Sequence, residues 1–111
     1  MTTRLPTHVL VQAKIRDAFA AGRAAVVISK GHENSGSIIV KILKPDGTCR
    51  VLSQTMDFEG NLAWLPAFDG KQVRESEADA YIARQLERDP DLWAVEFEDP
   101  DSANPFDGNE L

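Results

Sequence analysis

The sequence of 111 residues contains a single cysteine, which excludes a disulfide within the chain. A chain with Cys49 as its single cysteine is compatible with the reducing cytosol. No apolar run approaches the ~20 residues that a membrane-spanning helix needs. Near the N-terminus, Lys14, Arg16 and Asp17 come before an apolar run typical of a signal peptide has formed. We therefore expect a soluble, cytoplasmic protein that does not associate with membranes.

Metal-binding and catalytic motifs are also missing. His8 and His32 have no histidine one helical turn away and no cysteine pair nearby, so the spacing of a metal site is absent. The glycines of GHENSG (31–36) precede a strand rather than a helix, which argues against a phosphate-binding loop. Cys49 falls within a predicted strand, where a thiol is buried and unreactive. We expect no metal, no cofactor and no catalytic residue.

Charged residues are plentiful and unevenly divided. The chain has 12 Lys+Arg and 18 Asp+Glu, a net charge of −6. Residues 1–50 hold 8 basic and 3 acidic side chains, whereas residues 51–111 hold 4 and 15, so the halves carry +5 and −11. The fold either interleaves the two halves or presents a basic face to an anionic partner, with an acidic tail competing for it. We expect interleaving.

The first helix is predicted over residues 8–21. Thr7 is the expected N-cap, and Gly22 is placed to end the helix in a left-handed conformation. At helical spacing, one face collects the apolar side chains of Val11, Ile15, Ala18 and Phe19.

Three strands are predicted after this helix. Residues 24–30 are rich in β-branched side chains, which favour a strand. Residues 37–44 and 48–54 flank the turn residues PDG, so they predict a hairpin closed by a left-handed Gly47.

The second half predicts an edge strand, a helix and a final strand. Residues 62–67 contain a proline, which confines a strand to an edge. In SEAD, Ser76 and Asp79 have the spacing of a capping box at the start of a helix. Asp89–Pro90 ends this helix, because proline lacks the amide donor and disfavours helical angles before it. In 91–99, apolar and acidic residues alternate as in a half-buried strand.

The acid-rich stretch ERDPDLWAVEFEDPD (87–101) raises the question of a cation site or a catalytic carboxylate pair. In an extended strand, Asp91 and Glu96 lie about 16 Å apart and on opposite faces. Glu96 and Glu98 share a face, but two carboxylates are too few for a cation site. Nothing marks either of them for a raised pKa. We interpret these acids as solvated charges that protect a strand edge.

The predicted fold class is α+β. A largely antiparallel sheet of four or five strands is expected, with the two helices packed on one face. A single domain covers residues 1–99. Residues 100–111 are acidic, contain little to bury and are expected to be disordered.

Three segments carry a resemblance to a known family. They are AAGRAAVV at the end of the first helix, the hairpin SGSIIVKILKPDGT, and SEADAYIARQLERDPDLWAVEFED. In these segments the chain resembles the small bacterial family called domain of unknown function 1491, over most of residues 4–99. The resemblance implies a short α+β protein with no assigned activity, and it transfers no functional residue.

For function, a non-catalytic interaction module is the leading prediction. One alternative is a small enzyme with a site in residues 55–73, where Phe58 and Trp64 would line a pocket. The other is an anion or nucleic-acid binder that uses the basic N-terminal half, although the acidic chain argues against nucleic acid.

A homodimer is predicted from IIVKIL (38–43). Ile39 and Leu43 point to the opposite side of the sheet from the other apolar residues of this strand. Because both helices are expected on one face, Ile39 and Leu43 need another cover, either the 55–68 segment or a second copy. Lys41 would lay its stem across this self-association face.

Overall fold

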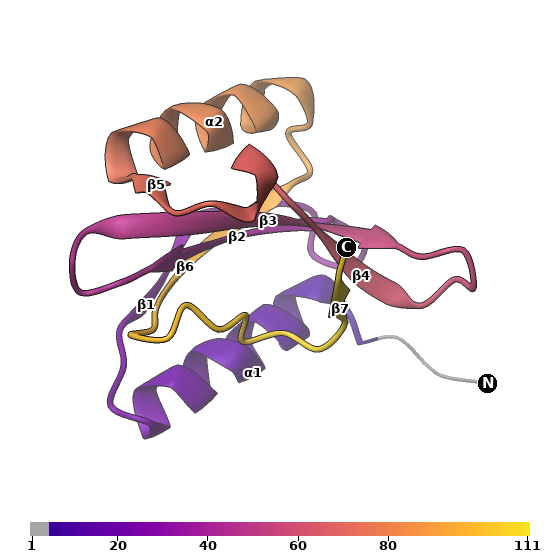
Figure 1. Ribbon diagram of the computed structural model, residues 1–111. Coiled ribbons are helices and arrows are strands. Elements are labelled where there is room, and N and C mark those ends of the chain that lie inside the picture. The colour runs from indigo at the N-terminus through magenta and orange to yellow at the C-terminus, as the bar shows by residue number, and fades with distance from the viewer. Residues whose placement is uncertain (1–4) are drawn as a thin grey trace.

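The computed structural model describes residues 5–111 and places two helices on opposite faces of one sheet (Figure 1). The helices are α1 (Thr7–Ala20) and α2 (Glu75–Arg88). The strands are β1 (Ala25–Ser29), β2 (Ile38–Leu43), β3 (Thr48–Met56), β4 (Leu62–Pro66), β5 (Val73–Arg74), β6 (Trp93–Glu98) and β7 (Asn109–Glu110). A short 3₁₀ helix, η1 (Phe68–Gly70), follows β4. Among the described residues, neither helix is long and apolar enough to cross a membrane.

The sheet is mixed rather than largely antiparallel, and within residues 5–111 it has seven strands rather than four or five. Its order is β1-β6-β2-β3-β4-β7, and β5 pairs with β3. β6 is parallel to β2 and β7 is parallel to β4. The first of these pairings follows from connectivity, because α2 carries the chain back across the sheet and such a crossover joins parallel strands. β5 and β7 have two residues each, too few to show an alternating pattern.

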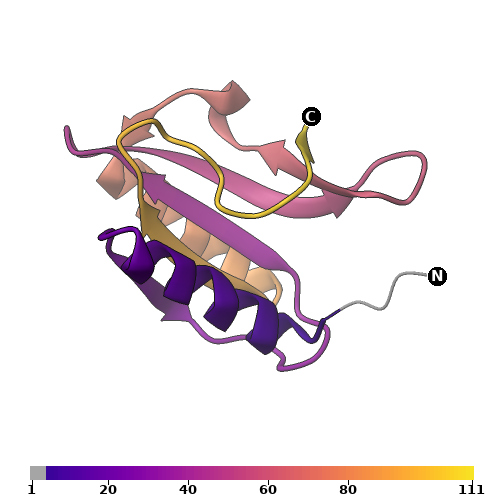
Figure 2. The ribbon, with the colours of Figure 1, turned by 90° about the horizontal axis from the view of Figure 1, so that it is seen from below.

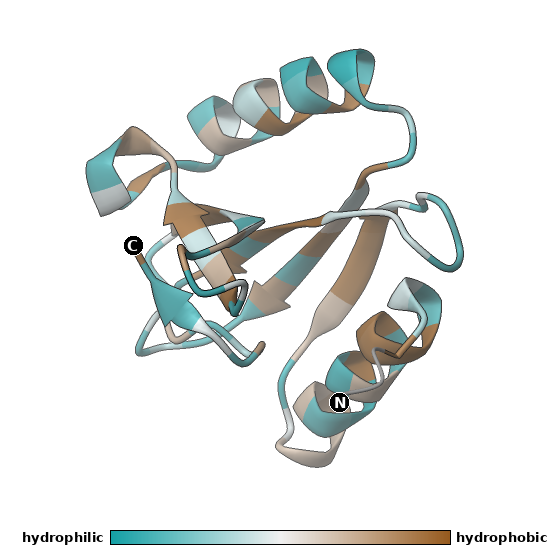
Figure 3. Cartoon of the chain, turned by 90° about the vertical axis from the view of Figure 1, so that its right-hand side faces the viewer, coloured by the Kyte–Doolittle hydropathy of each residue, from teal (hydrophilic) through white to brown (hydrophobic). Residues whose placement is uncertain are grey.

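The helices cover opposite faces of the sheet, so the prediction that both pack on one face is wrong. The double-sided apolar pattern of β2 is the cause. Ile38 and Val40 lie in a core with Val11 of α1, whereas Ile39 lies in a second core with Ala78 of α2. A strand that is apolar on both faces needs two covers, and each helix supplies one. Figure 3 shows the matching pattern on α2, whose outward side is hydrophilic and whose sheet-facing side is hydrophobic.

α1 follows the prediction in its extent but not in all its contacts. Val11 is buried, and Ile15 and Ala18 pack partly buried against the same core, but Phe19, predicted on the same face, is 60% exposed. Thr7 is the first helical residue, and Pro6 stands at the N-cap without a side-chain bond. The Thr7 hydroxyl instead donates a hydrogen bond to the carbonyl of Gly36, at 2.8 Å, and so ties the helix to the following turn.

Two local turn signals are confirmed and one is wrong. Gly47 has a φ of +86° and closes the β2–β3 hairpin, and α2 ends just before Asp89. However, α2 begins at Glu75, and its N-cap residue Arg74 makes no side-chain cap bond. Ser76 thus lies inside the helix, and the predicted capping box is absent. The Asp79 carboxylate instead accepts a hydrogen bond from Lys41.

β6 is an interior strand, between β1 and β2, and not the charged edge that was predicted. The alternation itself is confirmed, since Trp93, Val95 and Phe97 are all buried in the core on the α1 side. The opposite face of β6 carries Ala94, which is buried, and Glu96, which is half-buried.

The turn at 31–36 is shaped by the indole of Trp93, which donates a hydrogen bond to the carbonyl of His32 at 2.7 Å. A Cβ at Gly31 or at Gly36 would lie 2.2 Å from the carbonyl oxygen of Asp91. The two glycines thus permit a close approach between the turn and the start of β6.

The tail, residues 100–111, lies against the sheet on the α1 side and reaches β4 (Figures 1 and 2). Phe106 is only 5% exposed, and its ring centroid lies 5.3 Å from that of Trp64 and 5.7 Å from that of Phe97. The indole of Trp64 donates to the carbonyl of Asp107 at 2.9 Å. The structure thus differs from the expectation of a tail with little to bury.

Candidate functional site

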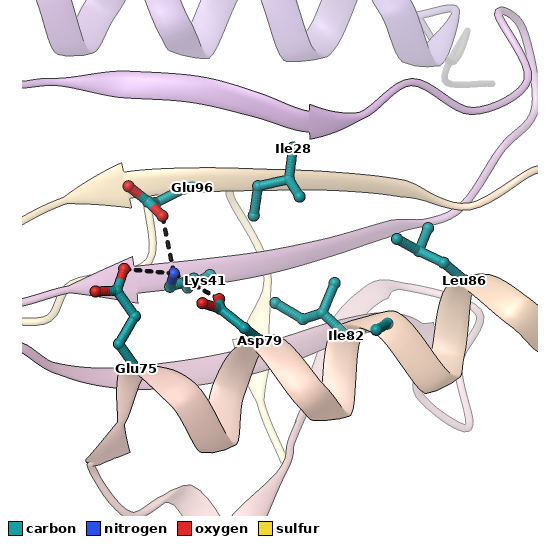
Figure 4. A pocket seen from close by; sticks show the side chains of 8 residues that line it. Ile28, Lys41, Glu75, Asp79, Ile82, Leu86 and Glu96 are labelled. Atoms are coloured by element: carbon teal, nitrogen blue, oxygen red, sulfur yellow. Dashed lines mark hydrogen bonds and ion pairs between the residues drawn. The ribbon is translucent and has the colours of Figure 1, made fainter.

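A groove of about 340 Å³ lies between α2 and β1, above β6 and β2 (Figure 4). It is the strongest candidate site because it combines a buried charge with exposed apolar side chains. Its lining consists of Ile28, Lys41, Glu75, Asp79, Ile82, Ala83, Leu86 and Glu96.

One end of the groove is a charge cluster centred on Lys41. The Lys41 ammonium lies 2.7 Å from a Glu75 carboxylate oxygen, 2.7 Å from Asp79 and 2.9 Å from Glu96. The Lys41 side chain is 3% exposed, whereas the side chains of Glu75 and Asp79 are about half exposed. Three negative charges thus surround one positive charge, and solvent reaches mainly the carboxylates.

The cluster keeps Lys41 protonated. Burial by itself would lower its pKa, but hydrogen bonds to Asp79, Glu75 and Glu96 outweigh burial and raise the pKa above its ordinary value. A lysine that acts as a base or as an amine nucleophile needs a lowered pKa. Lys41 is therefore held as a cation and is not poised as a base or an amine nucleophile at neutral pH.

The other end of the groove is apolar. Ile28 of β1 faces Ile82 and Leu86 of α2 across it (Figure 4). Ile28 belongs to a run of three exposed apolar residues on β1, in which Val26 is 52% exposed and Ile28 is 42% exposed. β1 contains no charged residue.

β1 is also an open edge of the sheet, since among the described residues it pairs with β6 and with no other strand. The amide of Glu98 donates a hydrogen bond to the carbonyl of Ala24, so Ala24 and Glu98 form a hydrogen-bonded pair of this antiparallel ladder. Hydrogen-bonded and non-hydrogen-bonded pairs alternate along such a ladder. The amides of Ala25 and Val27 therefore point away from β6. Unpaired backbone groups beside exposed β-branched side chains form a template on which another strand can add.

The three residues predicted to form a self-association face lie beneath α2. Ile39 has no exposed surface, Lys41 is buried in the charge cluster and Leu43 packs partly buried beside them. The main cover is thus α2, and Ala67 and Phe68, at the end of the 55–68 segment, also pack partly buried against this core.

Phe58 and Trp64, the predicted pocket residues, do not come together. Phe58 lies in the loop between β3 and β4 and is fully exposed, whereas Trp64 is fully buried against Phe106. Neither the groove nor a second cavity, lined in part by Arg23 and Asp99, includes a residue from 55–73.

The oppositely charged halves of the chain are interleaved. Arg23 pairs with Asp99 at 2.8 Å, Arg50 pairs with Glu110, and Lys41 pairs with three acids. Each of these pairs joins a cation from residues 1–50 to an acid from residues 51–111. A continuous basic face therefore has no support.

The other side chains considered as candidates for chemistry, Cys49, His8 and His32, are buried or hydrogen-bonded within the fold. Cys49 is fully buried, and burial raises the pKa of its thiol to about 11. His8 contacts the carbonyl of Glu33 at 3.0 Å, and His32 accepts hydrogen bonds from the amides of Asn34 and Ser35. Within residues 5–111, no three His, Cys, Asp or Glu side chains are grouped so as to hold a metal ion.

Sequence reasoning found Lys41 but missed its partners. A buried lysine inside an apolar strand needs acidic partners, so IIVKIL itself was a signal that acids lie beside this strand or on the element that covers it. Asp79 had been assigned to a capping box, and Glu96 to a solvated edge. Their meeting with Lys41 depends on the strand order, which the sequence does not display.

Comparisons with known proteins agree with the resemblance seen in the sequence. The family described as "Protein of unknown function (DUF1491)" matches residues 5–107. The crystal structure of a DUF1491 family protein from Caulobacter crescentus CB15 superposes with a TM-score of 0.87 at 32% identity, covering 97% of this chain and 100% of that chain.

Two solution structures are similar as well. For the NMR structure of a DUF1491 family protein from Caulobacter crescentus CB15, the TM-score is 0.85 at 32% identity, with 99% of each chain covered. For protein Atu0922 from A. tumefaciens, the TM-score is 0.72 at 30% identity, with 87% of each chain covered. No curated protein matches the sequence.

The family match extends beyond the three segments that carry the resemblance. It includes residues 55–73 and most of the tail. The family has no named activity, so no functional residue is transferred from it. The chain belongs to the DUF1491 family of proteins of unknown function.

Proposed function

We propose that this protein is a non-catalytic interaction module of the cytoplasm, which binds another protein chain through the open edge of β1. The observation that carries the proposal is the exposed apolar run Val26, Val27 and Ile28 on a strand with an unpaired edge. Added strands gain affinity from main-chain hydrogen bonds and specificity from pockets for alternate side chains. The groove beside β1 is such a pocket.

The state of the reactive groups supports a non-catalytic role. Lys41 is held as a cation by three acids, and the buried Cys49 thiol, with its raised pKa, stays protonated at neutral pH. The separation of Phe58 from Trp64 removes the support for an enzyme site in 55–73. A single buried cysteine is consistent with the cytoplasm.

The proposal still allows a homodimer, but its interface would be at β1. Two copies would pair β1 against β1 around a two-fold axis, instead of meeting at Ile39 and Leu43. A second copy and an unrelated protein are thus two partners for one surface, and a single experiment separates them.

The experiment is site-specific photo-crosslinking in living bacterial cells. A photoreactive amino acid replaces Val26, and a control protein carries it at Ala80, an exposed position of α2. We expect a discrete cross-linked product from position 26 only. A product with the mass of two chains identifies a homodimer, and any other discrete mass identifies a different protein.

A second substitution tests whether the partner adds as a strand. Val27→Pro removes an amide that points away from β6, and proline is tolerated at such edge positions. The product from position 26 should then disappear while circular dichroism stays unchanged. No product from position 26, or the same product from position 80, would contradict the proposal.

A further inference from the structure

We infer that the groove between α2 and β1 receives an extended protein segment in which lysine or arginine alternates with apolar residues. The inference rests on the proposed function, because the segment would lie beside β1 as an added strand. It goes further by naming the chemistry of the partner and the side chains that recognise it.

The charge cluster supplies the first argument. Three carboxylates meet one ammonium, so this end of the groove carries two net negative charges. The positive charge belongs to the buried Lys41, while Glu75 and Asp79 are half exposed at the rim. A ligand in the groove therefore meets carboxylates, and a cationic side chain is complementary to them.

The geometry of the sheet supplies the second argument. Neighbouring strands are about 4.8 Å apart, so a strand added to β1 lies about 10 Å from β6, which carries Glu96. A lysine or arginine side chain of the added strand would extend across Val26 of β1, which is paired with Glu96, and carry its charge toward the acidic end of the groove. Side chains in an added strand alternate between faces, so every second residue can point into the groove.

The apolar half of the groove supplies the third argument. Ile28 on β1 and the pair Ile82 and Leu86 on α2 border the same cavity. In such a strand the basic side chains share the groove face with Val26 and Ile28, whereas the apolar side chains lie on the opposite face beside Val27, which is exposed in the free chain. The stems of lysine and arginine also pack on apolar surface while the charged ends reach water or acids.

The charge of the whole chain favours such a partner over a second copy. Each copy carries a net charge of −6, so two copies repel one another at long range. The β1 strand of a second copy, AVVIS, also contains no basic residue to place at the acids.

Synthetic peptides test the inference in solution. The probes are a short fluorescein-labelled peptide of alternating valine and lysine, the same peptide with glutamate in place of lysine, and a third with serine in place of valine. Fluorescence anisotropy gives the affinities, and NMR chemical shifts report where each peptide binds. We expect the valine–lysine peptide to bind at least about tenfold more tightly than either of the others.

Charge-matched variants show which acids are responsible. Asp79→Asn leaves Glu75 and Glu96 on Lys41, and it should weaken binding of the valine–lysine peptide about threefold to tenfold. The control variant Asp17→Asn removes the same charge from an exposed position on α1, and it should leave the affinity unchanged. Circular dichroism verifies that both variants are folded. If Asp79→Asn fails to fold, the chemical-shift changes at β1 and α2 in the wild-type chain decide the question.

The outcomes separate this inference from the proposed function. Equal binding of the lysine and glutamate peptides at the β1 amides would support an open edge and overturn the basic partner. No shift at β1 or α2 with any peptide would also overturn the basic partner, while leaving the cross-linking result at position 26 to decide the interaction module. A cross-linked product with the mass of two chains would overturn the basic partner directly.

Discussion

The two edges of the sheet are treated differently by the same chain. At the β4 edge, the tail pairs through β7, the amide of Leu111 donates to the carbonyl of Trp64 at 2.9 Å, and Arg50 binds Glu110. At the β1 edge, the described residues provide no further strand, and Val26, Val27 and Ile28 remain exposed.

This difference teaches where to look for a partner. An uncovered apolar edge is a liability that proteins normally blunt with charge, with proline or with a covering segment. This chain covers its β4 edge with its own tail. Beside β1 it has a groove with an acidic end instead, so the open edge coincides with the most distinctive site of the molecule.

The largest expected effect is at the closed edge. Phe106→Ala should lower the free energy of unfolding by about 3–5 kcal/mol, because it empties a space between Trp64 and Phe97. Urea unfolding measures the change. Phe58→Ala is the matched control, since Phe58 is fully exposed and its loss should cost less than about 0.5 kcal/mol. A Phe106→Ala cost below about 1 kcal/mol would mean that the tail does not hold this edge in solution.

The next effect is in the groove beside the open edge. Lys41→Met should cost about 2–3 kcal/mol at neutral pH, because it leaves Glu96 half-buried and unpaired. The expected cost is moderate since Glu75 and Asp79 remain half solvated.

The Lys41 contribution also has a defined pH dependence. Its folded-state pKa is raised, so its stabilisation is fully present below the ordinary value of 10.5 and is lost as the pH rises toward the folded-state pKa. Urea unfolding at several pH values should show a constant difference between wild type and Lys41→Met from neutral pH to about 10, and a shrinking difference above that. A difference that changes between pH 7 and 9 would assign the cost to another group.

The smallest effect is at the open edge itself. Val26→Thr should change the free energy of unfolding by less than about 0.5 kcal/mol, because this side chain is already in water. The same substitution at Val95, a fully buried valine of β6, should cost about 1–3 kcal/mol because a hydroxyl would lie in the core. Similar losses at both positions in chemical denaturation would show that β1 is covered in the free protein.

Local features were predictable from the sequence, and long-range ones were not. Gly47 and Asp89–Pro90 act through their own backbone angles, so the hairpin and the end of α2 could be recognised. The insertion of β6 between β1 and β2 depends on a crossover that no residue pattern marks. Once β6 was taken as an edge, Glu96 was interpreted as a solvated charge.

The same limit explains the misplaced candidate site. The alternation of β2 correctly indicated two apolar faces, but it did not say which element covers each one. With both helices on one face, Ile39 was interpreted as an interface residue, although it packs with Ala78 and Ile82 of α2. Phe106 was overlooked because a single aromatic residue among prolines and acids shows no periodicity.

Hydrogen exchange followed by NMR on the free protein tests the contrast between the edges most directly. We predict that the amide of Val27, which points away from β6, exchanges nearly as fast as in an unfolded chain, whereas the indole proton of Trp64, which is bonded to Asp107, is protected. A rapidly exchanging Trp64 indole would show that the tail leaves its edge open. A protected Val27 amide in a monomeric sample would show that the β1 edge is closed, and either result would contradict the account.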